Sequence, residues 1–255
     1  ARTALVTTAG SRDTIEMRTE SRFEQYDLNL VLPAALIERK DRHVLAERIG
    51  VDGRVLRPFD EAEARALVDH LADRPEDEAY EAVAIGFIHA YVDGAHERRF
   101  RDLLLERLPD VAVSISSEVS PQMREFERFN TVCANAYVQP LMASYLNELD
   151  RQLQAEGARC PVYLIHSGGG LMSVDSAVRF PVRLVESGPA GGAIFAADIA
   201  ARHGLDAVLS YDMGGTTAKI CLIEDHTPST AKTFEVARTQ RFTKGSGMPI
   251  SIPVI

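Results

Sequence analysis

A short run of glycine and threonine residues between two apolar segments carries the residue types best suited to chemistry. The apolar runs 207–210 and 220–223 flank a link that holds Asp212, Gly214, Gly215, Thr216, Thr217 and Lys219. Two such runs joined by glycines predict a β-hairpin. Paired glycines let the backbone approach a ligand and aim successive N–H groups at one point, which suits a phosphate. We expect Asp212 to hold Mg²⁺ there through the metal's water molecules. An ordinary hairpin with a glycine turn is the alternative.

A helix is expected directly before this hairpin. Ser187 is a suitable N-cap and Pro189 suits a first helical turn, so Gly188 should lie at the helix start. Glycine within a helix costs about 1 kcal/mol relative to alanine, so a stripe of small residues indicates close packing. That stripe consists of Gly192, Ala196 and Ala200. Close approach of two helices from two lobes is one such packing.

A second glycine cluster begins with Gly168 and Gly169, after an apolar strand expected over residues 161–165. A turn at the carboxyl end of a strand is where α/β sheets bind ligands, so both glycines are candidates for cofactor contact. A tight strand-to-helix turn is the alternative. The neighbouring Ser167 lacks the G-x-S-x-G pattern of a nucleophile elbow, which disfavours a catalytic serine.

The charged clusters are less specific. None of the seven histidines has metal-ligand spacing such as H-E-x-x-H. Glu97, in the first turn of an expected helix, is interpreted as structural. On a helix, Arg124 and Arg128 would share a face, with Glu125 and Glu127 beside them. A solvated or lobe-bridging ion-pair network is favoured there over a clamp for a substrate anion.

Composition excludes several functions. The 37 acidic and 28 basic residues give a net charge of −9, which argues against a nucleic-acid surface. No run approaches the roughly 20 apolar residues of a membrane span, and no signal peptide is recognisable. The three cysteines are far apart and odd in number, which favours a reducing, cytoplasmic location without disulfides.

The order of expected elements is alternating α/β. Helices are expected over 61–71, 96–108 and 122–154, the last with a break at Pro140, and strands over 82–88 and 111–115. Such alternation favours a parallel or mixed sheet with covering helices. We expect two parts: residues 1–120 as an N-terminal α/β lobe or insert, and 121–255 as the part with the phosphate loop.

The chain resembles known proteins at several of these motifs. A small-residue helix, a strand and then Asp-x-Gly-Gly-Thr resembles the second phosphate loop of actin-like ATPases, which have a ribonuclease-H-like architecture of mixed sheets flanked by helices. Further segments narrow the resemblance to the hydantoinase A/5-oxoprolinase family, which includes acetone and acetophenone carboxylase subunits. These segments are 1–13, 90–99, 117–141, 166–173 and 184–219.

The resemblance implies ATP and Mg²⁺ as cofactors and phosphorylation of an amide, imide or ketone oxygen. Three functions remain open: opening of a hydantoin or 5-oxoproline-like ring, service as the ATP-using subunit of a ketone carboxylase, and a non-catalytic scaffold. A second subunit of the hydantoinase B type is the implied partner. Relatives also begin with a first phosphate loop that this sequence lacks, so we expect an internal fragment that is inactive in isolation. Lys219 stands where many relatives carry Asp, and its ammonium is suited to neutralise phosphate charge.

Overall fold

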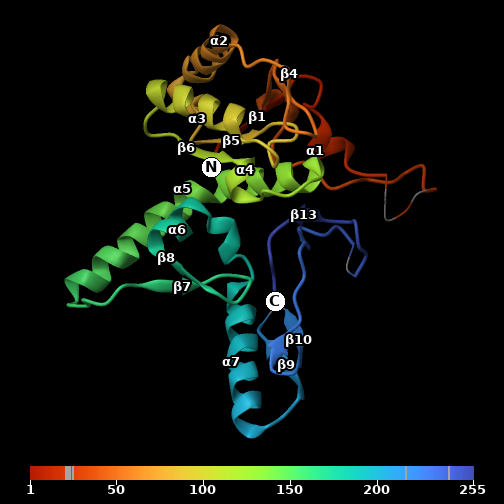
Figure 1. Cartoon of the computed structure of the whole chain (residues 1–255), viewed down its shortest axis with the longest axis vertical. Coiled ribbons are helices and arrows are strands. Elements are labelled where there is room, and N and C mark those ends of the chain that lie inside the picture. Colours follow the sequence, from red (N-terminus) through yellow and green to blue (C-terminus); the bar gives the residue numbers. More distant parts are fainter. Residues whose placement is uncertain (21–23, 25, 216, 241) are drawn as a thin grey trace. The chain divides into compact units, whose positions relative to one another are not determined.

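The computed structural model describes residues 1–20, 24, 26–215, 217–240 and 242–255 (Figure 1). The chain forms two compact units, which are described separately. The first unit comprises Ala1–Leu141 with Glu235–Ser251, and the second comprises Met142–Phe234 with Ile252–Ile255. Residue 121, where a division is expected from the sequence, precedes the helix Glu125–Ala155, and the two units instead meet within that helix, between Leu141 and Met142.

The elements follow one another in alternating order. The chain up to residue 119 contains β1 (Thr3–Thr8), α1 (Thr14–Met17), η1 (Arg39–Asp41), β2 (Arg42–Leu45), β3 (Arg48–Ile49), β4 (Val55–Arg57), α2 (Glu61–Ala72), η2 (Glu76–Glu78), β5 (Ala82–Gly86), α3 (Ala95–Arg107), β6 (Ala112–Ile115) and α4 (Ser116–Val119). The rest contains α5 (Glu125–Ala155), β7 (Tyr163–Ile165), β8 (Leu171–Ser173), α6 (Val174–Arg179), η3 (Pro181–Leu184), α7 (Ser187–His203), β9 (Ala207–Met213), β10 (Ala218–Glu224), β11 (Thr227–Pro228), β12 (Phe234–Val236) and β13 (Met248–Ile250).

A parallel sheet in the order β2–β1–β5–β6 forms the centre of the first unit. Every residue of β1 and β5 is buried, as expected for central strands covered on both faces. Helices α2 and α3 pack against each other and against this sheet, and Phe100, Leu103 and Leu104 of α3 contribute to its core.

The beginning of α5 belongs to the same unit and approaches strand β5 closely. A Cβ atom on Gly86 would lie 2.7 Å from the ring of Phe129, so only glycine allows this contact. In Figure 1 the strands β1, β5 and β6 lie between the α2–α3 pair and the start of α5. The expected sheet with covering helices is confirmed for this unit.

Local signals explain several element boundaries. Asp60 caps α2, because its Oδ1 accepts hydrogen bonds from the N–H groups of Ala62 at 2.8 Å and Glu63 at 3.1 Å. The break at Pro140 is absent: α5 runs through it from Glu125 to Ala155. A proline removes one N–H donor, and in a helix of this length the remaining ladder keeps the helix continuous.

The second unit is built around helix α7. Its buried stripe is Ala190, Ala193, Ala197 and Ala200, so the expected stripe is wrong at Gly192, which is exposed. The stripe packs against strands, β9, β10, β11 and β7, where a second helix was expected. A smaller core of Leu146, Met172 and Ala177 joins α5, β8 and α6.

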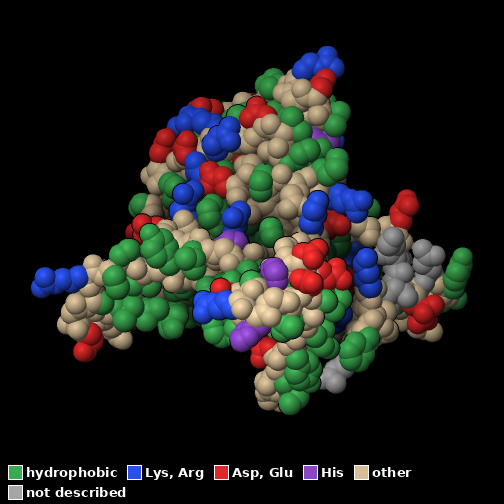
Figure 2. Space-filling view, turned by 60° about the horizontal axis from the view of Figure 1, so that its bottom comes forward, with side chains coloured by type: hydrophobic (Ala, Val, Ile, Leu, Met, Phe, Trp, Pro, Cys, Tyr) green, Lys and Arg blue, Asp and Glu red, His purple; other side chains and the backbone are tan. Residues whose placement is uncertain are grey.

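The hairpin of β9 and β10 leaves one face open to solvent. Leu209, Tyr211, Met213, Ile220 and Leu222 are each 56–69% exposed, although their types suit a core. Figure 2 shows exposed hydrophobic side chains along the lower part of the surface. Within the part of the chain that the structure describes, no helix combines the length and apolarity that a membrane crossing requires.

Candidate functional site

The predicted phosphate hairpin is present in the second unit. β9 and β10 pair antiparallel, with Met213 opposite Ala218 and Asp212 opposite Lys219. The N–H of Gly214 donates to the carbonyl of Thr217 at 3.0 Å and closes the loop. Thr216 lies outside the described residues.

Alternation along the hairpin places Asp212 and Lys219 on one face. Directly opposed residues of an antiparallel pair point to the same side, and residues two apart share that side. Ile223, two pairs further along this face, is buried, whereas the outward residues are the exposed apolar ones. The face that carries Ile223, Asp212 and Lys219 is therefore the one that α7 covers. Asp212 lies at the loop end of this face and is itself exposed.

Lys219 connects this face to the start of α7. Its Nζ lies 2.8 Å from Oε1 of Glu186, and both side chains are partly exposed. Glu186 has a left-handed backbone, φ 64° and ψ 20°, and is the N-cap residue of α7. The expectation that Ser187 is the cap is wrong: Ser187 is the first helical residue. A carboxylate at a helix N-terminus is favoured by the helix dipole, which explains the position of Glu186.

The loop and the helix start leave room for a ligand. A Cβ atom on Gly188 or on Gly215 would meet nothing within 4 Å, and on Gly214 only the carbonyl oxygen of Thr217 at 4.0 Å. Neither loop glycine has a left-handed φ. Their role therefore cannot be an unusual turn conformation; what they provide is space for close approach to the backbone.

The second glycine cluster forms a different structure from the one expected. Gly168 and Gly169 lie in the turn of the β7–β8 hairpin, which is neither a strand-to-helix turn nor the end of a parallel strand. Gly169 has φ +82°, and a Cβ there would lie 2.8 Å from Ile194 of α7 and closer still to Ile255. The protein itself fills this turn. Ile194 is eight residues beyond Glu186, about 12 Å along the helix.

Ser167 is occupied by a structural hydrogen bond. Its Oγ donates to the carbonyl of Pro253 at 2.7 Å, and the side chain is buried. Burial and the positive charge of Arg183 lower the pKa of the adjacent His166. A hydroxyl committed to a carbonyl is a poor nucleophile, in agreement with the missing elbow motif.

The residues present fit a magnesium nucleotide. Mg²⁺ in nucleotide sites commonly takes one or two carboxylates and completes its shell with water and phosphate oxygens. One exposed carboxylate, Asp212, beside open glycines and the free N–H groups of a helix start matches that requirement. Within the described residues, no three His, Cys, Asp or Glu side chains group closely enough to hold a metal ion.

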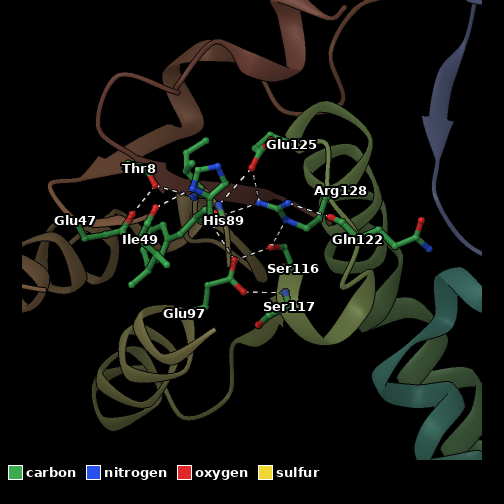
Figure 3. Close-up of polar contacts among 12 residues, drawn as sticks. Thr8, Glu47, Ile49, His89, Glu97, Ser116, Ser117, Gln122, Glu125 and Arg128 are labelled. Carbon is green, nitrogen blue, oxygen red and sulfur yellow. Dashed lines mark hydrogen bonds and ion pairs between the residues drawn. The ribbon is translucent and has the colours of Figure 1, made fainter. Parts of the chain in front are cut away.

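A buried polar network in the first unit was only partly anticipated (Figure 3). Glu97 is fully buried and accepts hydrogen bonds from the N–H groups of Phe87 and Ser117 and from the hydroxyl of Ser116, as its structural interpretation requires. Burial raises the pKa of this carboxyl, against the effect of those donors.

The arginine pair differs from expectation. Arg128 has a fully buried guanidinium that lies 3.3 Å from Glu125. The two residues form an ion pair inside the protein, and Arg128 does not belong to a solvated helix face. Arg124 precedes α5 with φ 80° and is 77% exposed, so the two do not share a helix face. Sequence spacing gave no sign that Thr8 and Glu47 join this network.

The fold and the hairpin define an α/β protein with an actin-like ATPase architecture. Two solved structures that resemble the chain support this class. Nucleotide-free acetone carboxylase matches with a TM-score of 0.79 at 22% identity, and the caprolactamase of Pseudomonas jessenii with 0.74 at 28% identity; each match covers 99% of this chain and 35% of the other. Both of those enzymes are ATP-dependent.

The chain belongs to the hydantoinase/oxoprolinase family. The family model for hydantoinase/oxoprolinase matches residues 128–255, and that for the N-terminal region matches residues 1–108. An uncharacterised protein of Methanocaldococcus jannaschii is 35% identical over 99% of this chain and 37% of its own length. Caprolactamase subunit alpha of Pseudomonas jessenii is 33% identical over 86% of this chain and 31% of its own length. The chain thus spans about a third of these relatives.

Proposed function

We propose that this chain is the nucleotide-binding part of an ATP-dependent enzyme that activates the oxygen of a cyclic amide, a hydantoin or 5-oxoproline-like lactam, before ring opening. The observation that supports it most directly is the meeting of Asp212, the open glycine loop and the start of α7 in the second unit. The caprolactamase relative supports an amide substrate.

Each residue has a separate part in this proposal. When bound, MgATP supplies the phosphoryl group for the amide oxygen. The N–H groups of Gly215 and Gly188 donate to phosphate oxygens, while Gly214, whose N–H closes the loop on Thr217, leaves room for the phosphate to approach. Asp212 accepts hydrogen bonds from the waters of Mg²⁺. Thr217, and from its sequence position Thr216, offer hydroxyls to the same oxygens.

Two predictions from the sequence differ in how far the geometry supports them. Lys219 is close enough to the loop to neutralise phosphate charge, although it pairs with Glu186. Gly168 and Gly169 have no comparable opening, so the proposal does not use them. The proposal also includes a second subunit of the hydantoinase B type and a cytoplasmic location. The partner subunit is supported by the caprolactamase relative, which is itself named as a subunit.

One observation favours a second function. The acetophenone carboxylase gamma subunit of Aromatoleum aromaticum is 30% identical over 75% of this chain, which makes the ATP-using subunit of a ketone carboxylase the alternative. A ketone oxygen would then accept the phosphoryl group at the same hairpin. A scaffold without catalysis is the outcome if no nucleotide binds.

Calorimetry with Mg-ATP tests the nucleotide site in this chain and in the full-length gene product. We expect binding by the wild type and its loss in Asp212→Asn, with the fold intact because Asp212 is exposed. Asp225→Asn is the matched control, since Asp225 lies in the exposed turn at the opposite end of β10. Phosphate release with hydantoin, 5-oxoproline or acetone then separates the functions. Unchanged Mg-ATP affinity in Asp212→Asn would contradict the assignment.

A further inference from the structure

The carboxyl edge of the first unit's sheet contains a second cluster of functional groups. From β1 the chain goes to β2 on one side and then returns to β5 on the other, so the strand order reverses between β1 and β5. Open α/β sheets bind ligands outside the carboxyl ends of their strands at such a reversal. Thr8 ends β1 at this point, and residues 87–89 follow β5.

The backbone that follows β5 is held by side chains from other elements (Figure 3). Its polar groups meet buried or partly buried partners, which fixes the segment before any ligand arrives. The bonds are Phe87 N–H to Glu97 at 2.9 Å, Phe87 carbonyl from Arg128 at 2.7 Å, Ile88 N–H to the Thr8 hydroxyl at 2.9 Å, and His89 N–H to Glu125 at 3.3 Å.

His89, at the end of this segment, has a left-handed backbone with φ 58°. That conformation is uncommon for histidine, and glycine or asparagine adopts it more readily. Strained residues of this kind persist when the surroundings hold them and are concentrated at functional sites. The side chain of His89 is only partly buried, so it can reach a ligand.

The hydrogen bonds of His89 determine which ring nitrogen is available. Its Nδ1 lies 2.9 Å from the carbonyl oxygen of Ile49, which only accepts, so Nδ1 must carry the proton. In the neutral ring Nε2 is then an acceptor. No described residue hydrogen-bonds this Nε2.

The charges around this edge restrict the ligand. Three carboxyl groups, Glu47, Glu97 and Glu125, belong to the network; Glu125 pairs with Arg128 at 3.3 Å and Glu47 lies 2.7 Å from Nδ1 of His96. An excess of carboxylates disfavours a phosphate or another anion. An acceptor nitrogen instead suits an uncharged ligand that donates an N–H. Gly10, just beyond the end of β1, is exposed, and a Cβ there would meet nothing within 4 Å, so this edge is open to solvent.

We propose that His89 Nε2 accepts a hydrogen bond from the N–H of an uncharged lactam or cyclic imide at this edge of the first unit. The inference rests on the proposed amide-activating function and adds a substrate contact to it. Thr8, Glu97, Glu125 and Arg128 are positioning residues, because they hold the segment from which His89 extends.

The test uses the full-length gene product, with hydantoin and caprolactam as probes and their dissociation constants measured by ligand-observed NMR. His89→Gly and His89→Asn remove Nε2 but suit the left-handed backbone, so both should fold with a melting temperature near that of the wild type. His226→Gly is the matched control, because His226 is also a left-handed histidine, in an exposed turn of the second unit.

We expect both His89 variants to raise the dissociation constant of the probes by about tenfold, the size of one hydrogen bond, and to leave Mg-ATP affinity unchanged. His226→Gly should change neither. Equal probe affinity in the wild type and the folded His89 variants would overturn the inference, as would a wild type that binds Mg-ATP but neither probe. Loss of the proposed function looks different: the wild type would then fail to bind Mg-ATP.

Discussion

At the scale of single residues, Lys219 shows how one charge can serve two partners. It forms an ion pair with Glu186 at 2.8 Å and lies opposite Asp212 on the hairpin. An exposed ion pair of this kind contributes at most about 1 kcal/mol to stability. Release of the ammonium from Glu186 toward a phosphate therefore costs little, and the pair is compatible with a role in nucleotide binding.

We predict that Lys219→Ala weakens Mg-ATP binding by several-fold, about 1 kcal/mol, as expected for one partly exposed charge. Calorimetry measures the change. Lys232→Ala, which removes an exposed lysine from the same unit, should have no effect. If both variants bind Mg-ATP equally well, Lys219 has only the structural contact with Glu186.

His43 gives the first unit a defined pH response. Burial, with a smaller effect of His70, lowers the pKa of His43 from 6.5 to about 4. The folded state therefore holds this ring neutral, while the unfolded chain binds a proton below about pH 6.5. The stability that follows is present above that pH and is lost as pH falls through about 4.

We predict that the free energy of unfolding falls less steeply between pH 7 and pH 4 in His43→Phe than in the wild type. Phenylalanine keeps the ring that packs 5.4 Å from His70 but cannot titrate. Urea denaturation at a series of pH values measures the slope. Loss of the hydrogen bond between His43 and Tyr80 lowers the stability of the variant at every pH, so the two curves are compared after the difference in unfolding free energy at pH 7 has been subtracted. Parallel curves for the two proteins would show that His43 does not titrate on unfolding.

At the scale of elements, the two glycine turns of the second unit have opposite surroundings. Gly169 is left-handed and surrounded by Ile194 and Ile255, while Gly215 faces open space. We predict that Gly169→Ala lowers the free energy of unfolding by about 2–4 kcal/mol, from strain and overpacking together. Gly215→Ala should change it by less than about 0.5 kcal/mol. Chemical denaturation of both variants checks the contrast, and equal stabilities would contradict it.

Local patterns predicted most elements, whereas partners distant in sequence stayed hidden. The Asp60 cap and the 207–223 hairpin depend on neighbours within a few residues, and the structure confirms both. Glu186 and Lys219 are 33 residues apart, so their pairing follows only from the packing of α7 on the hairpin. The buried stripe of α7 was misplaced because small residues occur on several of its faces.

The candidate site shows the same limit. The glycine loop and Asp212 are visible as a motif, but the segment that ends in His89 is held by four side chains of other elements, which no local pattern reveals. The spacing of Arg128 and its acidic neighbours predicts a solvated or lobe-bridging ion-pair network; the ion pair with Glu125 is present, but the Arg128 side chain is fully buried.

At the scale of the whole molecule, the chain spans about a third of its relatives, and the described residues include the glycine hairpin that we propose to bind phosphate. Holding nucleotide, metal and acceptor in one geometry can contribute about 7–11 kcal/mol to catalysis. We therefore predict that the isolated 255-residue chain releases phosphate from ATP far more slowly than about 1 per second, with or without substrate. A phosphate-release assay measures this. Substrate-stimulated turnover at enzyme-like rates would contradict it.

The open face of the β9–β10 hairpin has a practical consequence for work with this chain. β9 is an edge strand of its sheet, and Leu209, Tyr211 and Met213 point outward from it. An edge strand with exposed apolar side chains is a template for pairing with another molecule and for aggregation. Concentrated preparations should therefore self-associate reversibly, and a charged substitution such as Tyr211→Lys should extend the concentration range in which the chain stays monodisperse.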